Sequence, residues 1–378
     1  MKTPIYLDHM STTPVDGRVR AAMDAVYDLG PANPHAATHH YGWKASEILD
    51  KARRQVAGLI GASAPEVLFT SGATEANNWA LTGAMRASRK RRIVTSAIEH
   101  PCVLETARGL EREGRELVIL PVDGEGLVDA GAVADAIDDD TGLVSVMLAN
   151  NETGTIEPVA EIAQACRARG VLCHTDAVQA ACRIPIDVEA LGVDLLSLSA
   201  HKMYGPMGIG ALYVRSGTEI EPLLRGGSQQ GGLRAGTVPT PLAAGFGLAA
   251  EIAGADLINA MSCLADLADL LYESLRKGVP GLVAIHPDIR RLPGCLNVRV
   301  PGVVAEDWLL AAPEIAASTG AACASGVSGP SHVLRALGLS AEEAAGSIRL
   351  SVGRATTRQD VEFAAERLIE GLAKVEAG

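Results

Sequence analysis

Aromatic side chains are scarce in this sequence: phenylalanine, tyrosine and tryptophan together make up 3% of its 378 residues. A core of this chain must therefore be built mainly from aliphatic and small side chains. These are plentiful, since 48% of the residues are hydrophobic and 40 are glycine. This composition allows helices to pack closely on a sheet, which is typical of α/β proteins. The length is sufficient for one large domain and a smaller one.

Positive charge is also in deficit, because the formal net charge is −12 at pH 7. That balance argues against a nucleic-acid-binding surface. No apolar run reaches the length of a membrane span, and residues 1–14 contain no apolar signal segment. We therefore expect a cytoplasmic protein that binds neither nucleic acid nor a membrane.

The seven cysteines include no CxxC pair, which excludes the usual spacings of zinc sites and gives no sign of a disulfide framework. We expect most of them to be small buried residues. The exception is Cys323, which stands in a polar stretch rich in glycine and serine. Histidines 35, 39 and 40 share a loop without an accompanying carboxylate or thiolate, so we expect no metal site.

Strand-like and helical stretches alternate along the first two thirds of the chain. Apolar strands are predicted at 67–70, 93–96, 116–121, 143–148 and 171–175, and two more within 194–214. This alternation predicts a mostly parallel sheet with helices on both faces. Ligands of such sheets bind at the carboxyl ends of the strands. Seven polar residues fall at those ends: Thr74, His100, Asn151, Asp176, Ser199, His201 and Lys202.

A domain boundary is expected near Gly254 and Ala255, after an apolar helical stretch that follows Pro241. We predict a large domain over residues 15–254. Residues 1–14 and 255–378 are then expected to form a smaller α+β domain.

Lys202 lies between two apolar strands, in the stretch DLLSLSAHKMYGPMGIGALYV. Such a lysine is either an exposed residue of a hairpin loop or a desolvated amine with a lowered pKa. The second interpretation makes it suitable for a Schiff base with an aldehyde cofactor. Pro206, Gly208 and Gly210 indicate a tight turn directly after it.

Ser71 to Glu75 form a turn of small residues between a strand and a helix. The free N–H groups of such a helix start favour a phosphate, and Thr74 adds a hydroxyl; an ordinary helix cap is the alternative. The turn matches neither GxGxxG nor the P-loop, which argues against a nucleotide-binding oxidoreductase.

Three further side chains would suit an aldehyde cofactor with a phosphate and a pyridine ring. Asp176 could pair with the pyridine N–H and keep the ring an electron sink, although a turn aspartate is the alternative. His100 could lie against the ring, or be a structural histidine. Arg349, in an otherwise apolar strand, could bind a carboxylate bidentately or form an internal salt bridge.

Residues 318–330, STGAACASGVSGP, contain no large side chain that could anchor a core. We expect this stretch to be mobile. Its single cysteine, Cys323, is therefore expected to be exposed and able to act as a nucleophile, with an incidental small residue as the alternative.

With these residues placed, the sequence resembles the cysteine desulfurases of the NifS/IscS type. They form part of the class V aminotransferase branch of the fold-type I pyridoxal-phosphate enzymes. The resemblance covers nearly the whole chain and keeps the order of the motifs. The matching stretches are YLDHMSTTP, NPHAATHHYG, FTSGATEANN, EHPCVLET, NNETGTIEP, HTDAVQA, SLSAHKMYGPMGIGALYV, GGLRAGT, STGAACASG, SHVLRALGL and SIRLSVGRATT.

The resemblance implies pyridoxal 5′-phosphate as the cofactor and assigns roles residue by residue. Lys202 matches the Schiff-base lysine, Asp176 the partner of the pyridine nitrogen, and Gln179 the donor to the phenolic oxygen. His100 matches the stacking histidine. The expected phosphate-binding residues are Ala73, Thr74, Ser199 and His201, with Thr237 of a neighbouring subunit, which implies a homodimer.

The resemblance also implies the reaction. Asn151 and Arg349 match the pair that binds the carboxylate of the substrate, L-cysteine. Lys202 would remove the Cα proton and the Cys323 thiolate would attack the substrate sulfur. A persulfide on Cys323 and free alanine are the products. An acceptor protein, either an iron–sulfur scaffold or a tRNA-thiolation enzyme, would then take the sulfur.

Some positions depart from the family pattern. Ala200 and Met10 stand where smaller or amide residues are usual, and Gln230-Gly231 replace a Glu-Arg pair. Ala321 and Ala324 replace hydroxyl residues beside the cysteine. Two alternatives to a cysteine desulfurase therefore stay open. One is a related lyase, such as a selenocysteine lyase, or an aminotransferase-like enzyme; the other is a non-catalytic partner protein that keeps the fold.

Overall fold

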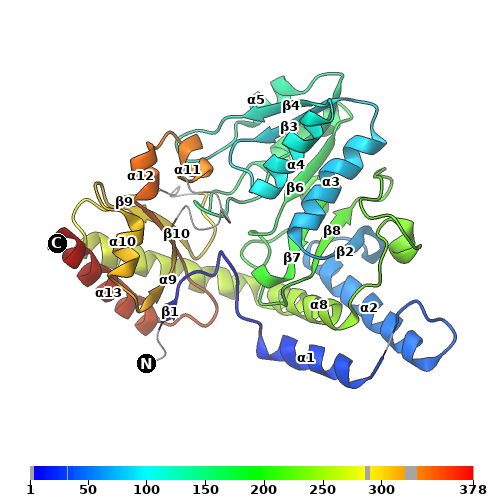
Figure 1. Cartoon of the computed structure of the whole chain (residues 1–378), viewed down its shortest axis with the longest axis horizontal. Coiled ribbons are helices and arrows are strands. Elements are labelled where there is room, and N and C mark those ends of the chain that lie inside the picture. The colour runs from blue at the N-terminus through cyan, green and yellow to red at the C-terminus, as the bar shows by residue number, and fades with distance from the viewer. Residues whose placement is uncertain (1–3, 32, 286–289, 320–329, 378) are drawn as a thin grey trace.

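The computed structural model describes residues 4–31, 33–285, 290–319 and 330–377 (Figure 1). Its largest sheet has seven strands and is mixed, because β8 runs antiparallel to both of its neighbours while the other pairs are parallel. The strands lie in the order β2 (Val67–Thr70), β8 (Gly210–Val214), β7 (Leu195–Ser199), β6 (Leu172–Asp176), β5 (Thr141–Ser145), β3 (Arg92–Ser96) and β4 (Glu116–Leu120). This confirms the predicted α/β class with a mostly parallel sheet.

The central strands are apolar almost throughout because both faces of the sheet are covered by helices. On one face, Leu68, Leu143 and Leu212 pack with side chains of α3 (Ala73–Ala87) and α4 (Pro101–Arg112). On the other, Phe69, Val144 and Leu196 belong to a second core. The helices of that core are α2 (His40–Leu59), α5 (Ala130–Ala136), α6 (Val159–Ala168) and α8 (Thr240–Ala255), with α1 (Gly17–Asp28) and the short α7 (Val188–Leu191) beside them.

A smaller sheet lies beside the large one, and the successive helices α8 and α9 (Leu257–Gly278) lead from the large part of the molecule to the smaller one (Figure 1). It is antiparallel, in the order β12 (Ser318–Thr319), β13 (Ser347–Ser351), β10 (Cys295–Arg299) and β9 (Val283–Ala284). A separate pair joins β1 (Ile5–Tyr6) in parallel to β11 (Ile315–Ala316). The helices of this part are α9 (Leu257–Gly278), α10 (Ala305–Leu310), α11 (His332–Ala336), α12 (Ala341–Ala345) and α13 (Arg358–Ala377).

One hydrophobic core of the smaller part consists of Ile5, Leu7 and residues from Leu264 onwards, including Trp308 and Leu368. The main core also includes Met10, Leu292 and Cys295, so the cores do not separate cleanly at the predicted division into residues 15–254 and residues 1–14 with 255–378. The division itself stays a prediction.

Several local expectations can be compared with the structure. The helix predicted from about residue 76 begins at Ala73, directly after Gly72. Gly72 has φ 154° and ψ −178°, a combination essentially restricted to glycine, so the helix starts where this residue ends the turn. Among the histidines 35, 39 and 40, His39 caps α2, because its Nδ1 accepts the Gly42 N–H at 3.2 Å.

Most of the described cysteines are buried as expected: Cys166, Cys173, Cys182 and Cys295. We expected Cys323 to be the one cysteine that is not buried, and this expectation is wrong. Cys263 is exposed on α9 and Cys102 is half-buried on α4. Both lie on helices whose apolar faces are formed by other residues. Looking for cysteines in polar loops therefore does not identify them. Cys323 lies outside the described residues.

Within the described residues, no single helix is both long and apolar enough to span a bilayer. The helices α8 and α9 pass such a test only when taken together, and they are bent by 75° relative to each other.

Candidate active site

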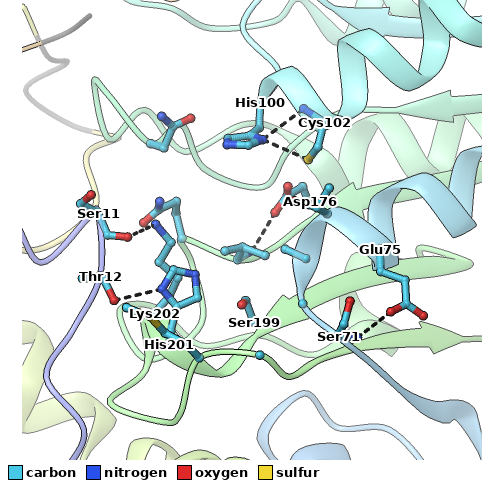
Figure 2. A pocket seen from close by; sticks show the side chains of 18 of the residues that line it. Ser11, Thr12, Ser71, Glu75, His100, Cys102, Asp176, Ser199, His201 and Lys202 are labelled. Carbon is cyan, nitrogen blue, oxygen red and sulfur yellow. Dashed lines mark hydrogen bonds between the residues drawn. The ribbon is translucent and has the colours of Figure 1, made fainter. Parts of the chain in front are cut away.

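A cavity of about 600 Å³ opens at the carboxyl edge of the large sheet (Figure 2). Its walls come from the ends of β5, β6 and β7, the start of α3, the start of α4 and the segment before α1. The seven polar residues expected at the strand ends all line it: Thr74, His100, Asn151, Asp176, Ser199, His201 and Lys202. The fold therefore places around one cavity residues that are up to 128 positions apart in the sequence, from 74 to 202.

Lys202 ends the short 3-10 helix η2 (Ala200–Lys202), directly after β7. Its Nζ donates to the carbonyl oxygens of Met10 and Ser11, at 2.6 Å each. The segment that provides these carbonyls is fixed to the lysine loop, because the Thr13 N–H donates to the His201 carbonyl at 3.0 Å. The amine is thus half-buried at the cavity and bonded, which differs from an exposed lysine in a hairpin loop.

Asp176 is the last residue of β6 and is 7% exposed. Its Oδ1 accepts the Val178 N–H at 3.0 Å, and its Oδ2 accepts Asn77 Nδ2 at 2.6 Å. These two donors fix the orientation of the carboxyl group that is expected to pair with a ring nitrogen. Asn77, on α3, was not singled out from the sequence. It lies on the same apolar face as Ala80, Leu81 and Ala84. A polar residue at such a position indicates a buried hydrogen-bond partner, so the sequence could have identified it.

His100 precedes α4 and caps it, because its Nδ1 accepts the Cys102 N–H at 3.2 Å. The Cys102 Sγ lies 3.0 Å from the same nitrogen. Burial lowers the pKa of His100, and the neighbouring Lys202 acts in the same direction while Asp176 opposes it. The imidazole at this wall of the cavity is therefore neutral over a wider pH range than a free histidine.

The opposite end of the cavity suits an anion. Residues 71–74 lead into α3, a helix of 15 residues whose N-terminus faces the cavity. Ser199 and His201 line the same region, and His201 Nδ1 lies 3.1 Å from the Thr12 hydroxyl. Burial and the adjacent Lys202 lower the pKa of His201 to about 4, so this ring is neutral at pH 7.

A salt bridge joins the start of α3 to the glycine-rich stretch 226–237. Glu75 accepts the Ser71 N–H at 2.7 Å and pairs with Arg234 at 2.9 Å. Arg234 thereby fixes the loop that leads to Thr237. Thr237 itself is exposed and is not among the residues that line the cavity of this chain.

The two proposed substrate-binding residues lie at different depths. Asn151 lines the cavity and its buried Oδ1 has no hydrogen-bond partner among the described residues, so it offers an unused acceptor. Arg349 is 2% exposed and is not a lining residue. Its Nη2 donates to Asp8 and its Nη1 to the Asn151 carbonyl, both at 2.8 Å. The internal salt bridge considered for Arg349 is thus present.

Gln179 lines the cavity too, and its Nε2 donates to the Met10 carbonyl at 3.0 Å. The side chain of Met10 points elsewhere: it is fully buried in the main core and does not line the cavity. The departure at position 10 therefore affects the core, while the backbone carbonyl of the residue serves both Gln179 and Lys202.

Two buried carboxyl groups beside the cavity were missed by the sequence reasoning. Glu99, directly before His100, is fully buried and bonds Ser96 Oγ and the Met147 N–H. Burial raises its pKa to about 8. Glu152, next to Asn151, accepts the Ser331 hydroxyl at 2.6 Å, and burial raises its pKa to about 7. Both residues follow predicted strands, as do their neighbours His100 and Asn151, which were identified for that reason.

Gln230 has a structural role in the glycine-rich stretch, where it stands in place of the glutamate that is usual in the family. Its amide makes a two-bond contact with the backbone of Phe69 on β2, accepting the N–H at 2.7 Å and donating to the carbonyl at 2.8 Å. An amide can make both bonds, whereas a carboxylate has no proton for the second. Ala321 and Ala324, like Cys323, lie outside the described residues.

The donor set fits pyridoxal 5′-phosphate. An amine, a carboxylate and a neutral imidazole surround one cavity, and the N-terminus of α3 provides an anion cradle at its other end. The orphaned Oδ1 of Asn151 adds an acceptor for a bound molecule. The fold and this site define the class of the protein as a pyridoxal-phosphate enzyme of fold-type I.

Comparison with known proteins agrees. The model of the family "Aminotransferase class-V" matches residues 5–363, so the chain belongs to that family. A mouse (Mus musculus) protein named cysteine desulfurase is 44% identical over 370 residues, covering 97% of this chain and 81% of that protein. A solved "NifS-like protein" superposes with a TM-score of 0.92 at 37% identity, covering 99% of this chain and 100% of that one. The structure titled "SspA in complex with cysteine" gives 0.82 at 36% identity, over 92% and 98% of the two chains.

Proposed function

We propose that this chain is a pyridoxal-phosphate-dependent cysteine desulfurase that converts L-cysteine to L-alanine. One observation carries the proposal: Lys202, Asp176 and the N-terminus of α3 lie around a single cavity. The family membership and the relatives named cysteine desulfurase support the same activity.

The residues that would hold the cofactor divide by the part of it they contact. Ala73, Thr74, Ser199 and His201 would bind the phosphate, Asp176 the ring nitrogen, Gln179 the phenolic oxygen and His100 the ring face. When bound, the cofactor supplies an electron sink for the carbon attached to the amino group. Lys202 then serves as the base: with its amine free, it takes the Cα proton of the substrate.

Asn151 and Arg349 are proposed to bind the substrate carboxylate. Asn151 lines the cavity, where its side-chain NH₂ group would donate to the carboxylate, and Arg349 is attached to the backbone of the same residue. Because Arg349 also pairs with Asp8, a bound carboxylate would share this guanidinium with Asp8. The solved relative in complex with cysteine supports this choice of substrate class.

Cys323 is proposed as the acceptor of the sulfur. Its thiolate attacks the substrate sulfur, an S–S bond forms as the Cβ–S bond breaks, and the electron pair left on carbon takes a proton to give alanine. The described residues on either side support this placement. Ser318 is the register partner of Arg349, and Ser331 bonds Glu152 beside Asn151. The chain therefore leaves and returns next to the proposed substrate site.

We further propose a homodimer in which Thr237 completes the phosphate site of the partner subunit. Thr237 is exposed and does not reach the cavity of its own chain, which supports a role in trans. The sulfur of Cys323 is proposed to pass to an acceptor protein, an iron–sulfur scaffold or a tRNA-thiolation enzyme. The six described cysteines are free thiols, which favours a reducing compartment such as the cytoplasm.

The test is an absorption spectrum of the purified protein before and after addition of L-cysteine, with alanine and sulfide measured alongside. Wild type, Cys323→Ala and the control Cys263→Ala are compared, since Cys263 is an exposed thiol on α9. With excess L-cysteine as the thiol that reduces the persulfide, we expect a yellow protein that releases alanine and sulfide, and loss of both products only in Cys323→Ala.

Two outcomes would contradict the proposal. Spectral changes with undiminished product formation in Cys323→Ala would favour a related lyase or an aminotransferase-like enzyme. A colourless protein that pyridoxal phosphate does not reconstitute would favour a non-catalytic partner protein that keeps the fold.

A further inference from the structure

A chain of hydrogen-bonding groups connects Asp176 to His100 through Asn77 and Cys102, and Figure 2 shows its last link, between Cys102 and His100. Asn77 Nδ2 lies 2.6 Å from Asp176 Oδ2 and 3.2 Å from Cys102 Sγ. Cys102 Sγ in turn lies 3.0 Å from His100 Nδ1. Two side chains proposed to contact the cofactor are thus linked through two that are not.

We propose that the Cys102 thiol is a positioning residue that holds His100 as the neutral tautomer with its proton on Nε2. The hydrogen bonds of the chain fix the direction of each proton. The inference concerns residues of this chain, and only its kinetic consequence rests on the proposed function.

The orientation of the Asn77 amide follows from its partner. A carboxylate only accepts hydrogen bonds, so the group facing Asp176 must be the NH₂ group. The second hydrogen of that NH₂ is then available to Cys102 Sγ, while Asn77 Oδ1 has no partner among the described residues. Cys102 therefore receives a hydrogen bond from Asn77, and its own S–H must find another acceptor.

The acceptor available to the thiol is His100 Nδ1. This nitrogen already accepts the backbone N–H of Cys102, which cannot act as an acceptor itself. Nδ1 is therefore unprotonated in the structure, and the ring proton of the neutral imidazole is on Nε2. Two donors from a single residue, the backbone amide and the thiol, share the one lone pair of Nδ1 and so hold this tautomer.

The thiol must keep its proton to act as a donor, and its surroundings ensure that it does. Burial, together with the charge of Asp176, raises the pKa of Cys102 to about 12. Cys102 is thus a poor nucleophile and a permanent S–H donor at neutral pH. This distinguishes it from Cys323, for which a thiolate is proposed.

Protonation of His100 depends on every charged group that faces the ring. Burial opposes the cation most strongly; Asp176 favours it, whereas Lys202 and His332 oppose it. Glu99 bonds Ser96 and Met147, and the carbonyl of Glu99 lies 2.8 Å from His332 Nε2. Since a protonated Nδ1 could no longer accept from Cys102, the thiol adds to the groups that favour the neutral ring.

The experiment uses the full-length protein labelled with ¹⁵N-histidine, loaded with pyridoxal phosphate. Long-range ¹H–¹⁵N correlation spectra report which ring nitrogen is protonated, and a His100→Gln sample assigns the resonance. In wild type we expect Nδ1 to be of the unprotonated type and Nε2 of the protonated type. A protonated Nδ1 in the neutral ring would overturn the proposal directly, without any Cys102 variant.

The variants test the contribution of the thiol. Cys102→Ala removes the S–H and keeps the backbone donor, so the pKa of His100 should rise by about half to one pH unit, the size of one lost hydrogen bond. Cys102→Ser keeps a donor and should titrate like wild type, as should Cys263→Ala. An unchanged midpoint in Cys102→Ala, or equal shifts in the Ala and Ser variants, would contradict the proposal.

A second readout separates this inference from the proposed activity. If alanine production depends on neutral His100, the acidic limb of its pH profile should move with the NMR midpoint in Cys102→Ala and return in Cys102→Ser. Absence of desulfurase activity in all samples, with the NMR shifts present, would reject the proposed function and leave the tautomer assignment standing. Activity with no NMR difference between the variants would reject the role of Cys102 alone.

Discussion

Arg349 donates to Asp8 at 2.8 Å, which ties β13 to the segment that leads from β1 into the cavity wall. The arginine side chain is 2% exposed and the aspartate 16%. A second hydrogen bond runs from Arg349 to the carbonyl of Asn151. One guanidinium thus joins three segments distant in sequence, and a substrate carboxylate would have to be accommodated next to an existing ion pair.

Replacing Asp8 by alanine should therefore be costly, because it leaves a buried guanidinium without its carboxylate. We expect Asp8→Ala to lower the free energy of unfolding by about 3 kcal/mol, measured by urea denaturation at pH 7. Asp269→Ala is the matched control: it removes the carboxylate from Arg291, but Asp269 is 62% exposed. That variant should lose less than about 1 kcal/mol. Equal losses in the two variants would show that the buried Asp8–Arg349 pair contributes no more to the free energy of unfolding than the exposed Asp269–Arg291 pair.

The contact between Gln230 and Phe69 gives the second prediction. Gln230 is 9% exposed and bonds both backbone groups of Phe69. Gln230→Glu restores the residue type usual in the family, but its carboxylate would face the Phe69 carbonyl without a proton to donate. We expect a loss of about 1–3 kcal/mol at pH 8, and a smaller loss at pH 5, where the new carboxyl group is more readily protonated.

Gln229→Glu is the control for that substitution, because the amide oxygen of Gln229 accepts the Gly236 N–H at 3.1 Å. A carboxylate can accept it equally well, so stability should change little at either pH. If Gln230→Glu were as stable as wild type at pH 8, the two-bond contact would not contribute to folding.

The alternation of apolar strands and helices was sufficient to predict the α/β class and the edge of the sheet where the cavity lies. Thr74, Asp176 and Lys202 could be predicted because each lies at the end of a strand or within four residues after it, and parallel strands end at one edge. Asp8 and Arg349 could not be paired in the same way. Their residue types suggest an ion pair, but only the packing of β1 and β13 brings them together.

Asn77 and Gln230 show a different limit. Their partners, Asp176 and Phe69, are separated from them by 99 and 161 positions in the chain. A polar residue on an apolar helix face signals that some partner exists, because an unsatisfied buried amide is costly. Which partner it finds depends on how α3 and the stretch 226–237 dock on the sheet, and that is not encoded in local periodicity.

The pH dependence of stability provides the third prediction, at Glu157. This residue is 4% exposed, and its Oε2 accepts the Val128 N–H at 2.9 Å. Burial raises its pKa from 4.5 to about 8, with a further contribution from Asp123. Between these two values the folded state keeps a proton that the unfolded state has lost. Stability contributed by Glu157 is therefore complete below about pH 4.5 and falls as the pH rises towards 8.

Glu157→Gln removes this titration while keeping an oxygen for Val128. Its unfolding free energy should fall less steeply between pH 5 and 8, by up to about 1.4 kcal/mol per pH unit. Urea denaturation of both proteins at several pH values measures the difference. Glu99 and Glu152 have the same sign and remain in both proteins, so they cancel in the comparison. Parallel curves for wild type and Glu157→Gln would reject the assignment.

The fourth prediction concerns Gly205, which packs closely against Ala200 in the loop that carries Lys202. A Cβ atom at position 205 would come within 2.8 Å of the Ala200 carbonyl oxygen and 2.9 Å of its Cβ. The same carbonyl accepts the Gly205 N–H at 3.0 Å, so the two residues have little room to separate. We expect Gly205→Ala to cost about 1–3 kcal/mol of stability and to weaken the binding of pyridoxal phosphate, because the displaced turn carries the Lys202 amine.

Urea denaturation and a titration of the protein with pyridoxal phosphate measure the two effects. The double variant Ala200→Gly with Gly205→Ala should recover only part of the loss, since the contact with the carbonyl oxygen remains after the methyl group is removed. Gly58→Ala is the matched control within α2, where an added Cβ meets nothing within 4 Å. That variant should be more stable than wild type by about 0.5–1 kcal/mol. The packing argument fails if Gly205→Ala binds the cofactor as tightly as Gly58→Ala, because the turn would then have accommodated the methyl group without moving Lys202.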